Sequence, residues 1–164
     1  MQNVTSAILQ KLEDAACSYE LLEHHLVFTM DDVEKHICVP IESRVKTMVV
    51  ATQGPAGLTP ILCGLQATAR LDIKKVAGLI GLSRSKVSMM SPEAAEDVLA
   101  MPRGAIGLIA PFFSPHVILS QFFKYQPYVC FGVGRNDRTL KISIENLRKV
   151  TQVNFADIEK KGGV

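Results

Sequence analysis

One strand-turn-strand segment constrains the fold of this chain more than any other feature. Residues 44–51, RVKTMVVA, are rich in β-branched side chains, and they end at residues 52–57, TQGPAG, which have the Gly and Pro content of a turn. Residues 58–65 continue as a second apolar run. We therefore expect a β-hairpin over residues 44–65, and the fold must contain a sheet built on it.

Alternation of side chains along residues 44–51 places one lysine in an otherwise apolar row. One face of the strand carries Val45, Thr47, Val49 and Ala51. The other face carries Lys46, Met48 and Val50. Lys46 then has two explanations. It is a charge on an edge strand whose stem extends to solvent, which is a structural role, or it is an ammonium in a cleft that holds a carbonyl or phosphate oxygen of a ligand.

Helix and strand signals alternate along the rest of the chain. Thr29 and Asp32 form a capping-box pattern, and Asp72 and Ser91 are further N-cap candidates. We expect helices over residues 5–17, 29–39, 72–81, 91–101 and after Ser143, and strands over residues 18–22, 87–89, 117–119, 128–133, 139–142 and 152–155. Because hairpin-like pairs outnumber strand-helix-strand units, this order predicts a mixed α/β fold with a curled sheet rather than a doubly wound parallel one.

The composition is that of one folded domain. The 164 residues fit a single domain over residues 1–164, and 48% hydrophobic with 21% charged residues exclude disordered and fibrous classes. The formal net charge of +2 is too small for a protein that grips a polyanion by bulk charge. Any contact with nucleic acid must therefore be local.

The sequence also argues against membrane insertion. Residues 104–123 carry no Lys, Arg, Asp or Glu, but they contain Pro111, Pro115 and His116. We interpret this stretch as a loop followed by a buried strand. The apolar patch at residues 8–9 is too short for a signal peptide, so we expect a cytoplasmic protein that does not contact a membrane.

The cysteines and histidines lack the spacing of a metal or redox site. They are Cys17, Cys38, Cys63 and Cys130, with His24, His25 and His36 as the clustered histidines. The cysteines fit no zinc knuckle, CxxC pair or haem-attachment pattern, and the histidines have no carboxylate or cysteine at matching spacing. We expect reduced thiols, no metal and no cofactor.

Familiar catalytic motifs are missing as well, including GxSxG, HExxH, the P-loop and a GxGxxG that opens a helix. Two features are left. One is Lys46. The other is the uncharged segment GAIGLIAP at residues 104–111, whose two glycines let the backbone come close to a ligand, or else form a buried bulge or crossover.

Several short motifs, taken in order, resemble one family. They are Val45-Lys46-Thr47, Leu71-Asp72-Ile73-Lys74-Lys75, Ser91-Pro92-Glu93-Ala94-Ala95, Gly107-x-x-x-Pro111-Phe112 and Phe155-Ala156-Asp157-Ile158. This series resembles the YbaK/EbsC/ProX-type aminoacyl-tRNA deacylases over nearly the whole chain. The resemblance implies a curled, barrel-like mixed sheet surrounded by helices, as in the editing insertion of bacterial prolyl-tRNA synthetase.

The resemblance also implies a site and a reaction. Lys46 matches the catalytic pocket lysine that engages the 3′-terminal aminoacyl-adenosine, and Thr47 follows it in the same motif. Gly107 and Pro111 match the GxxxP loop whose backbone lies against the aminoacyl ester. Tyr19 and Phe28 are similar in position to pocket-wall residues of some members, with simple core packing as the alternative for each. The implied reaction is hydrolysis of mischarged aminoacyl-tRNA in trans, with the mischarged tRNA as substrate and a synthetase as a docking partner.

Three hypotheses remain open at this stage. Phe113 stands where relatives carry a smaller residue, so it would narrow the amino-acid pocket in favour of a small side chain such as alanine, or block it. The first hypothesis is an editing hydrolase. The second is a catalytically silent module of the same fold that binds an aminoacyl or nucleotide ligand, and the third is a metal or redox role, which the spacing disfavours.

Overall fold

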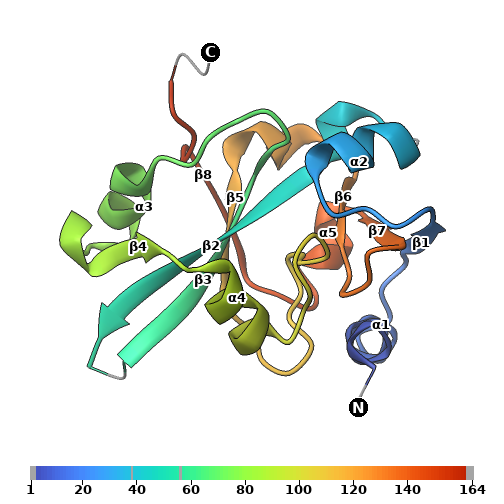
Figure 1. The fold of residues 1–164 in the computed structure, drawn as a ribbon, viewed down its shortest axis with the longest axis horizontal. Coiled ribbons are helices and arrows are strands. Elements are labelled where there is room, and N and C mark those ends of the chain that lie inside the picture. Colours follow the sequence, from blue (N-terminus) through green and yellow to red (C-terminus); the bar gives the residue numbers. More distant parts are fainter. Residues whose placement is uncertain (1–2, 38, 56, 162–164) are drawn as a thin grey trace.

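The expected hairpin is present and forms the centre of the structure. β2 (Val45–Gly54) pairs antiparallel with β3 (Gly57–Gln66), and this register sets Thr47 opposite Gly64. The computed structural model describes residues 3–37, 39–55 and 57–161, so Cys38 lies outside the described residues. Figure 1 shows the two long strands crossing the molecule, with α3 and β4 toward one end and β1, β6 and β7 at the other.

Eight strands form two sheets in the described part of the chain. Besides the hairpin they are β1 (Glu20–Glu23), β4 (Val87–Met89), β5 (His116–Ser120), β6 (Val129–Gly132), β7 (Arg138–Ile142) and β8 (Val153–Ala156). One sheet has the order β4-β2-β3-β5-β8, in which β5 runs parallel to both neighbours, and the other has the order β1-β7-β6. A parallel bridge between Arg44 and Cys130 connects them. The mixed α/β class is confirmed.

The described part of the chain has five α-helices, and all but the first begin at a predicted cap; Asn3 caps the first without having been predicted. They are α1 (Val4–Asp14), α2 (Met30–His36), α3 (Ile73–Ile80), α4 (Pro92–Leu99) and α5 (Ile144–Leu147). Thr29 and Asp32 form the reciprocal capping box, and Asp72 and Ser91 each accept a backbone N–H of their helix. α1 is shorter than the expected 5–17, because Ala16 takes a left-handed φ of 54° and ends the helix.

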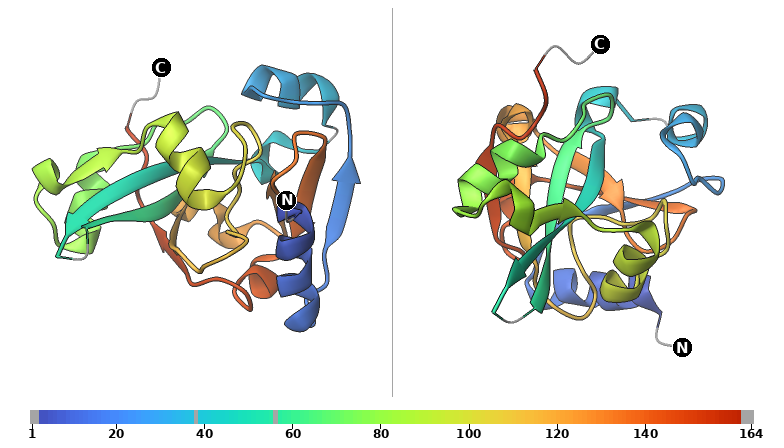
Figure 2. Two further views of the ribbon diagram at one scale, coloured as in Figure 1. Left: turned by 60° about the horizontal axis from the view of Figure 1, so that its bottom comes forward. Right: turned by 60° about the vertical axis from the view of Figure 1, so that its left-hand side comes forward.

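Alternation along β2 divides the interior into two apolar cores. Val45 and Val49 face the larger core, which also receives Ile8 and Leu12 of α1. Val50 faces a smaller core beneath α3. The two views of Figure 2 place α2 at the periphery, at the end of the molecule that holds β1 and β7. No helix within the described residues has both the length and the apolar character needed to cross a bilayer.

Candidate active site

A pocket opens where one edge of β2 loses its strand neighbour. β4 pairs only with residues 50–52 of β2, and the bridge to Cys130 is made by Arg44, just before the strand begins. Among the described residues, no strand pairs with this edge between Val45 and Val49. A cavity of about 510 Å³ lies here, within the range of roughly 300–1,000 Å³ that is usual for small-molecule sites.

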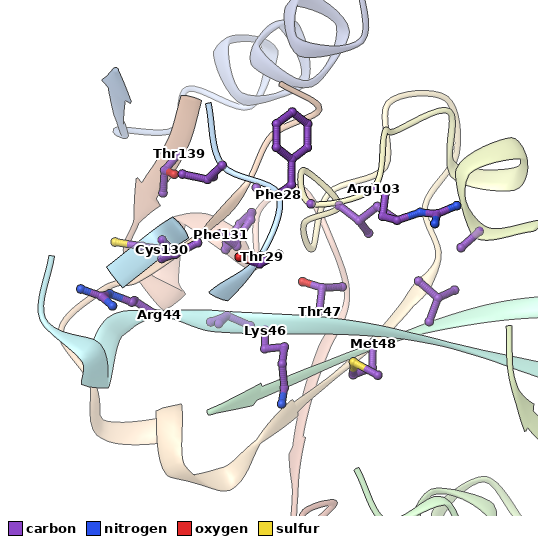
Figure 3. A pocket seen from close by; sticks show the side chains of 18 of the residues that line it. Phe28, Thr29, Arg44, Lys46, Thr47, Met48, Arg103, Cys130, Phe131 and Thr139 are labelled. Atoms are coloured by element: carbon purple, nitrogen blue, oxygen red, sulfur yellow. The ribbon is translucent and has the colours of Figure 1, made fainter. Parts of the chain in front are cut away.

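Thr47 lies at the middle of this open edge. Backbone groups of an antiparallel strand point to alternate edges, and the Val49 carbonyl accepts the Met90 N–H at 2.9 Å on the open side. The amide and carbonyl of Thr47, two residues earlier, therefore point to the same side. The Thr47 hydroxyl is buried and has no hydrogen-bond partner in the described structure. In Figure 3 it points to the side of β2 on which Phe28, Thr29 and Phe131 lie.

Basic residues contribute to the lining of the pocket. Arg44, Lys46, Arg103 and Arg138 contribute to its lining, and no Asp or Glu does so among the residues described. Arg103 is paired with Glu96 at 2.9 Å, and Arg138 with Asp137 at 3.1 Å. Arg44 instead donates to the backbone carbonyls of Ile37 and Val39, which leaves its charge uncompensated by a carboxylate in the described part of the chain. The pocket therefore favours an anionic ligand.

The ammonium of Lys46 lies on the opposite side of β2 from Thr47. Its stem contributes to the pocket lining, but its Nζ donates to the carbonyl of Ala69. Figure 3 shows the side chain directed away from Thr47 and Phe28. Burial lowers the pKa of this ammonium, nearby Glu159 raises it and Arg70 lowers it further. In this arrangement Lys46 joins β2 to the connection between β3 and α3.

The GxxxP segment supports the pocket wall but does not line it. Gly107 is in close contact with β6, where a Cβ at this position would lie 1.8 Å from the Gly132 carbonyl oxygen. Pro111 is buried and is absent from the lining. Gly104 and Ile106, from the same loop, are the residues that reach the pocket. The Nζ of Lys11 fixes the far end of the segment, donating to the carbonyl of Ala110 at 2.6 Å.

The three aromatic candidates occupy different places. Phe28 lines the pocket and is 57% exposed. Tyr19 does not line it, because its ring packs against the larger core and its hydroxyl donates to Glu13 at 3.4 Å. Phe113 also lies elsewhere, at a second surface hollow beside His116. The expected narrowing of the pocket by Phe113 is therefore wrong for this cavity.

The thiols and imidazoles near the pocket have structural partners. Cys130 contributes to the lining, but burial raises the pKa of its thiol, which disfavours the nucleophilic thiolate. The two ring nitrogens of His24 lie 2.6 Å from the His25 carbonyl and 2.8 Å from the Thr139 hydroxyl. Within the described residues, no three His, Cys, Asp or Glu side chains form a group that could hold a metal ion.

The pocket also contains residues that sequence reasoning missed. Arg44, Met90 and Thr139 come from three separate segments, and no short motif contains more than one of them. One signal was available for Arg44, which directly precedes the VKT motif and the apolar strand. Nothing local marks Met90 or Thr139, because distant segments position them: the Met90 N–H donates to the Val49 carbonyl, and β7 pairs with β1.

The mixed α/β fold and its cation-lined pocket define a domain suited to an anionic ligand of nucleotide size. Its family is shown by comparison. The chain belongs to the aminoacyl-tRNA editing domain family, whose model matches residues 24–150. The resemblance found in the sequence motifs is thereby confirmed.

Individual relatives are similar over almost the whole chain. The prolyl-tRNA editing protein ProX of Acetoanaerobium sticklandii is 23% identical over 155 residues, which cover 90% of each chain. The crystal structure of the hypothetical protein APE2540 superimposes with a TM-score of 0.80 at 18% identity, covering 94% of this chain and 99% of that one. The crystal structure of a protein assigned as a trans-editing enzyme for prolyl-tRNA synthetase superimposes with a TM-score of 0.77 at 16% sequence identity. The match covers 98% of this chain and 99% of that one. These structural matches establish the fold.

Proposed function

We propose that this protein hydrolyses the ester of mischarged aminoacyl-tRNA in trans. The family supports this class of substrate, and the ProX relative supports the editing reaction. The observation that carries the proposal is Thr47, whose buried hydroxyl has no hydrogen-bond partner among the described residues and whose backbone amide faces a pocket with several basic residues in its lining. The 3′ end of an aminoacylated tRNA carries groups that complement this pocket, namely a phosphate for the basic residues and an ester carbonyl for the donors of Thr47.

The reaction needs stabilisation of negative charge rather than a protein nucleophile. Water adds to the carbonyl carbon of the ester, and the bond between that carbon and the ribose oxygen breaks. The ribose oxygen takes up a proton, and the amino acid leaves as the free acid. Negative charge develops on the carbonyl oxygen during the addition, and in this proposal the N–H and hydroxyl of Thr47 donate to it. The raised pKa of Cys130 agrees with direct attack by water.

We also propose that Lys46 acts on the substrate, as the family motif implies. Its ammonium would leave the Ala69 carbonyl and pass over the unpaired edge of β2, since a lysine has a flexible four-carbon stem. Loss of the hydrogen bond to the neutral Ala69 carbonyl costs about 1 kcal/mol, and a charge-assisted contact with an anionic substrate offsets this cost. Gly107 and Pro111 would act indirectly, by supporting the loop that carries Gly104 and Ile106.

The position of Lys46 also favours a second candidate, a silent binding module of the same fold. With its ammonium on the Ala69 carbonyl, the pocket would bind an aminoacyl or nucleotide ligand without polarising it. The two functions differ in one measurement, because only the first consumes aminoacyl-tRNA. With a net charge of +2, either function requires local contacts to the tRNA end or docking on a synthetase.

The test is deacylation of a panel of mischarged tRNAs by the purified protein and by Thr47→Val. Valine keeps the shape of threonine but cannot donate, so we expect kcat to fall about tenfold, as for one hydrogen bond. The melting temperature should stay equal or rise, because an unpartnered buried hydroxyl is removed.

Thr68→Val is the matched control, since Thr68 is exposed and lies outside the pocket. Hydrolysis of no member of the panel would reject the deacylase and leave the binding module. Full activity of Thr47→Val would remove Thr47 from the mechanism.

A further inference from the structure

The pocket has two chemically different ends, arranged along β2. Arg44 lies at one end and Val49 at the other, about 16 Å apart at the usual rise of a strand. Thr47 lies between them, and Figure 3 shows Arg44 and Thr139 on one side of it and Arg103 on the other. A ligand that contacts Thr47 at its reacting carbonyl therefore extends one part toward each end. The following inference rests on the proposed deacylase function.

The Arg44 end suits the nucleotide. Arg44 carries a lining charge without a carboxylate partner in the described chain. Thr139 also lines the pocket, with its hydroxyl 2.8 Å from a ring nitrogen of His24. Arg138 adds a second guanidinium, although Asp137 and Glu23 share its charge. A phosphate of the tRNA end gains most from this position, because the other lining arginine, Arg103, is already paired with Glu93 and Glu96.

The Val49 end has an apolar wall, and Arg103 lies on the same side of Thr47 with its charge paired to two carboxylates. Val49, Met90, Pro92 and Ala95 form this wall, from β2, the residue that follows β4 and the start of α4. The Met90 N–H is bonded to the Val49 carbonyl, so these residues form one continuous wall. None of the four side chains carries a hydrogen-bonding group other than the weakly accepting thioether of Met90. A polar side chain placed against this wall would lose its hydration without compensation.

We infer that this apolar end receives the side chain of the amino acid, and that the preferred substrates carry an aliphatic side chain larger than the methyl of alanine. With the ester carbonyl of the substrate at Thr47 and its nucleotide at Arg44, the amino-acid side chain extends toward the Val49 end. A methyl group fills part of this end, and a longer aliphatic group contacts Met90 and Ala95 as well. The inference replaces the preference for alanine that Phe113 suggested in the sequence.

The test compares one tRNA acylated with alanine, α-aminobutyrate, valine or threonine, under single-turnover conditions. We expect the rate at subsaturating enzyme to rise about fourfold for each added methyl or methylene group. Valine and threonine have the same shape but threonine carries a hydroxyl, so the valyl ester should be hydrolysed about tenfold faster than the threonyl ester. The inference would be overturned if the threonyl ester were hydrolysed as fast as the valyl ester or faster, or if the alanyl ester were hydrolysed fastest of the four. Either result would leave the deacylase function standing. Hydrolysis of none of the four esters would also overturn the inference, while the wider panel of mischarged tRNAs decides separately on the deacylase function.

A pair of variants locates the preference. Met90→Ala removes part of the apolar wall, and we expect the ratio of valine to alanine rates to fall about fourfold. Leu79→Ala is the control, because Leu79 is exposed on α3 and does not line the pocket. The ratio is insensitive to the fraction of folded enzyme, so loss of stability in Met90→Ala does not affect it. An unchanged ratio in Met90→Ala would place the amino-acid side chain elsewhere and overturn the inference.

Discussion

Lys46→Ala is expected to lower the rate of aminoacyl-tRNA hydrolysis about 10²-fold or more, the usual cost of losing an electrostatic stabiliser of the transition state. The effect should appear in kcat, since the ammonium would contact the carbonyl oxygen or a phosphate most strongly as charge develops. Single-turnover hydrolysis with saturating enzyme measures it directly. Lys74→Ala is the matched control, because Lys74 is exposed on α3.

The structure makes this experiment decisive, because Lys46 has a structural alternative. Its Nζ donates to the Ala69 carbonyl, so alanine would also leave that acceptor unpaired and cost about 1 kcal/mol of stability. A purely structural Lys46 predicts a lower melting temperature with an unchanged rate for the folded fraction. That result would remove Lys46 from the chemistry.

Gly107→Ala is expected to destabilise the fold by about 3 kcal/mol or more, as overpacking against backbone does. A Cβ at this position would lie 1.8 Å from the Gly132 carbonyl oxygen and 2.7 Å from the Phe131 ring. β6 and the loop that carries Gly104 and Ile106 would have to separate. Urea denaturation followed by circular dichroism measures the loss.

Gly78→Ala provides the opposite result in the same assay. Gly78 lies inside α3, and a Cβ added there would meet nothing within 4 Å, so alanine should stabilise the helix by about 1 kcal/mol or less. Comparison of the two variants separates the general effect of a glycine replacement from the contact with β6. If Gly107→Ala were as stable as the wild-type protein, the close packing of the loop on Gly132 would be contradicted.

Local features of the fold could be predicted from the sequence. The hairpin, the capping box at Thr29 and Asp32, and the cap at Asp72 depend on residues within a few positions of one another. Alternation along β2 was also correct, since Thr47 and Lys46 point to opposite sides. Each of these follows from backbone geometry that neighbouring side chains determine.

The location of the pocket could not be predicted in the same way. Alternation separated Thr47 from Lys46, but it could not show which side would hold the cavity. That depends on where β4 stops along β2, and on Arg44 reaching Cys130 from a segment 86 positions earlier in the sequence. The family motif drew attention to the lysine, whereas the unpartnered hydroxyl of Thr47 became evident only from the assembled structure.

The position of β8 has a consequence for biosynthesis. β8 covers the edge of β5 through parallel pairing from Val117 to Ser120. A nascent chain that has emerged from the ribosome only as far as α5 therefore exposes the backbone of a strand whose Val117 and Leu119 are fully buried in the finished protein. Such an edge is a template for pairing with other chains, so premature termination before β8 should yield aggregates rather than a shortened folded protein.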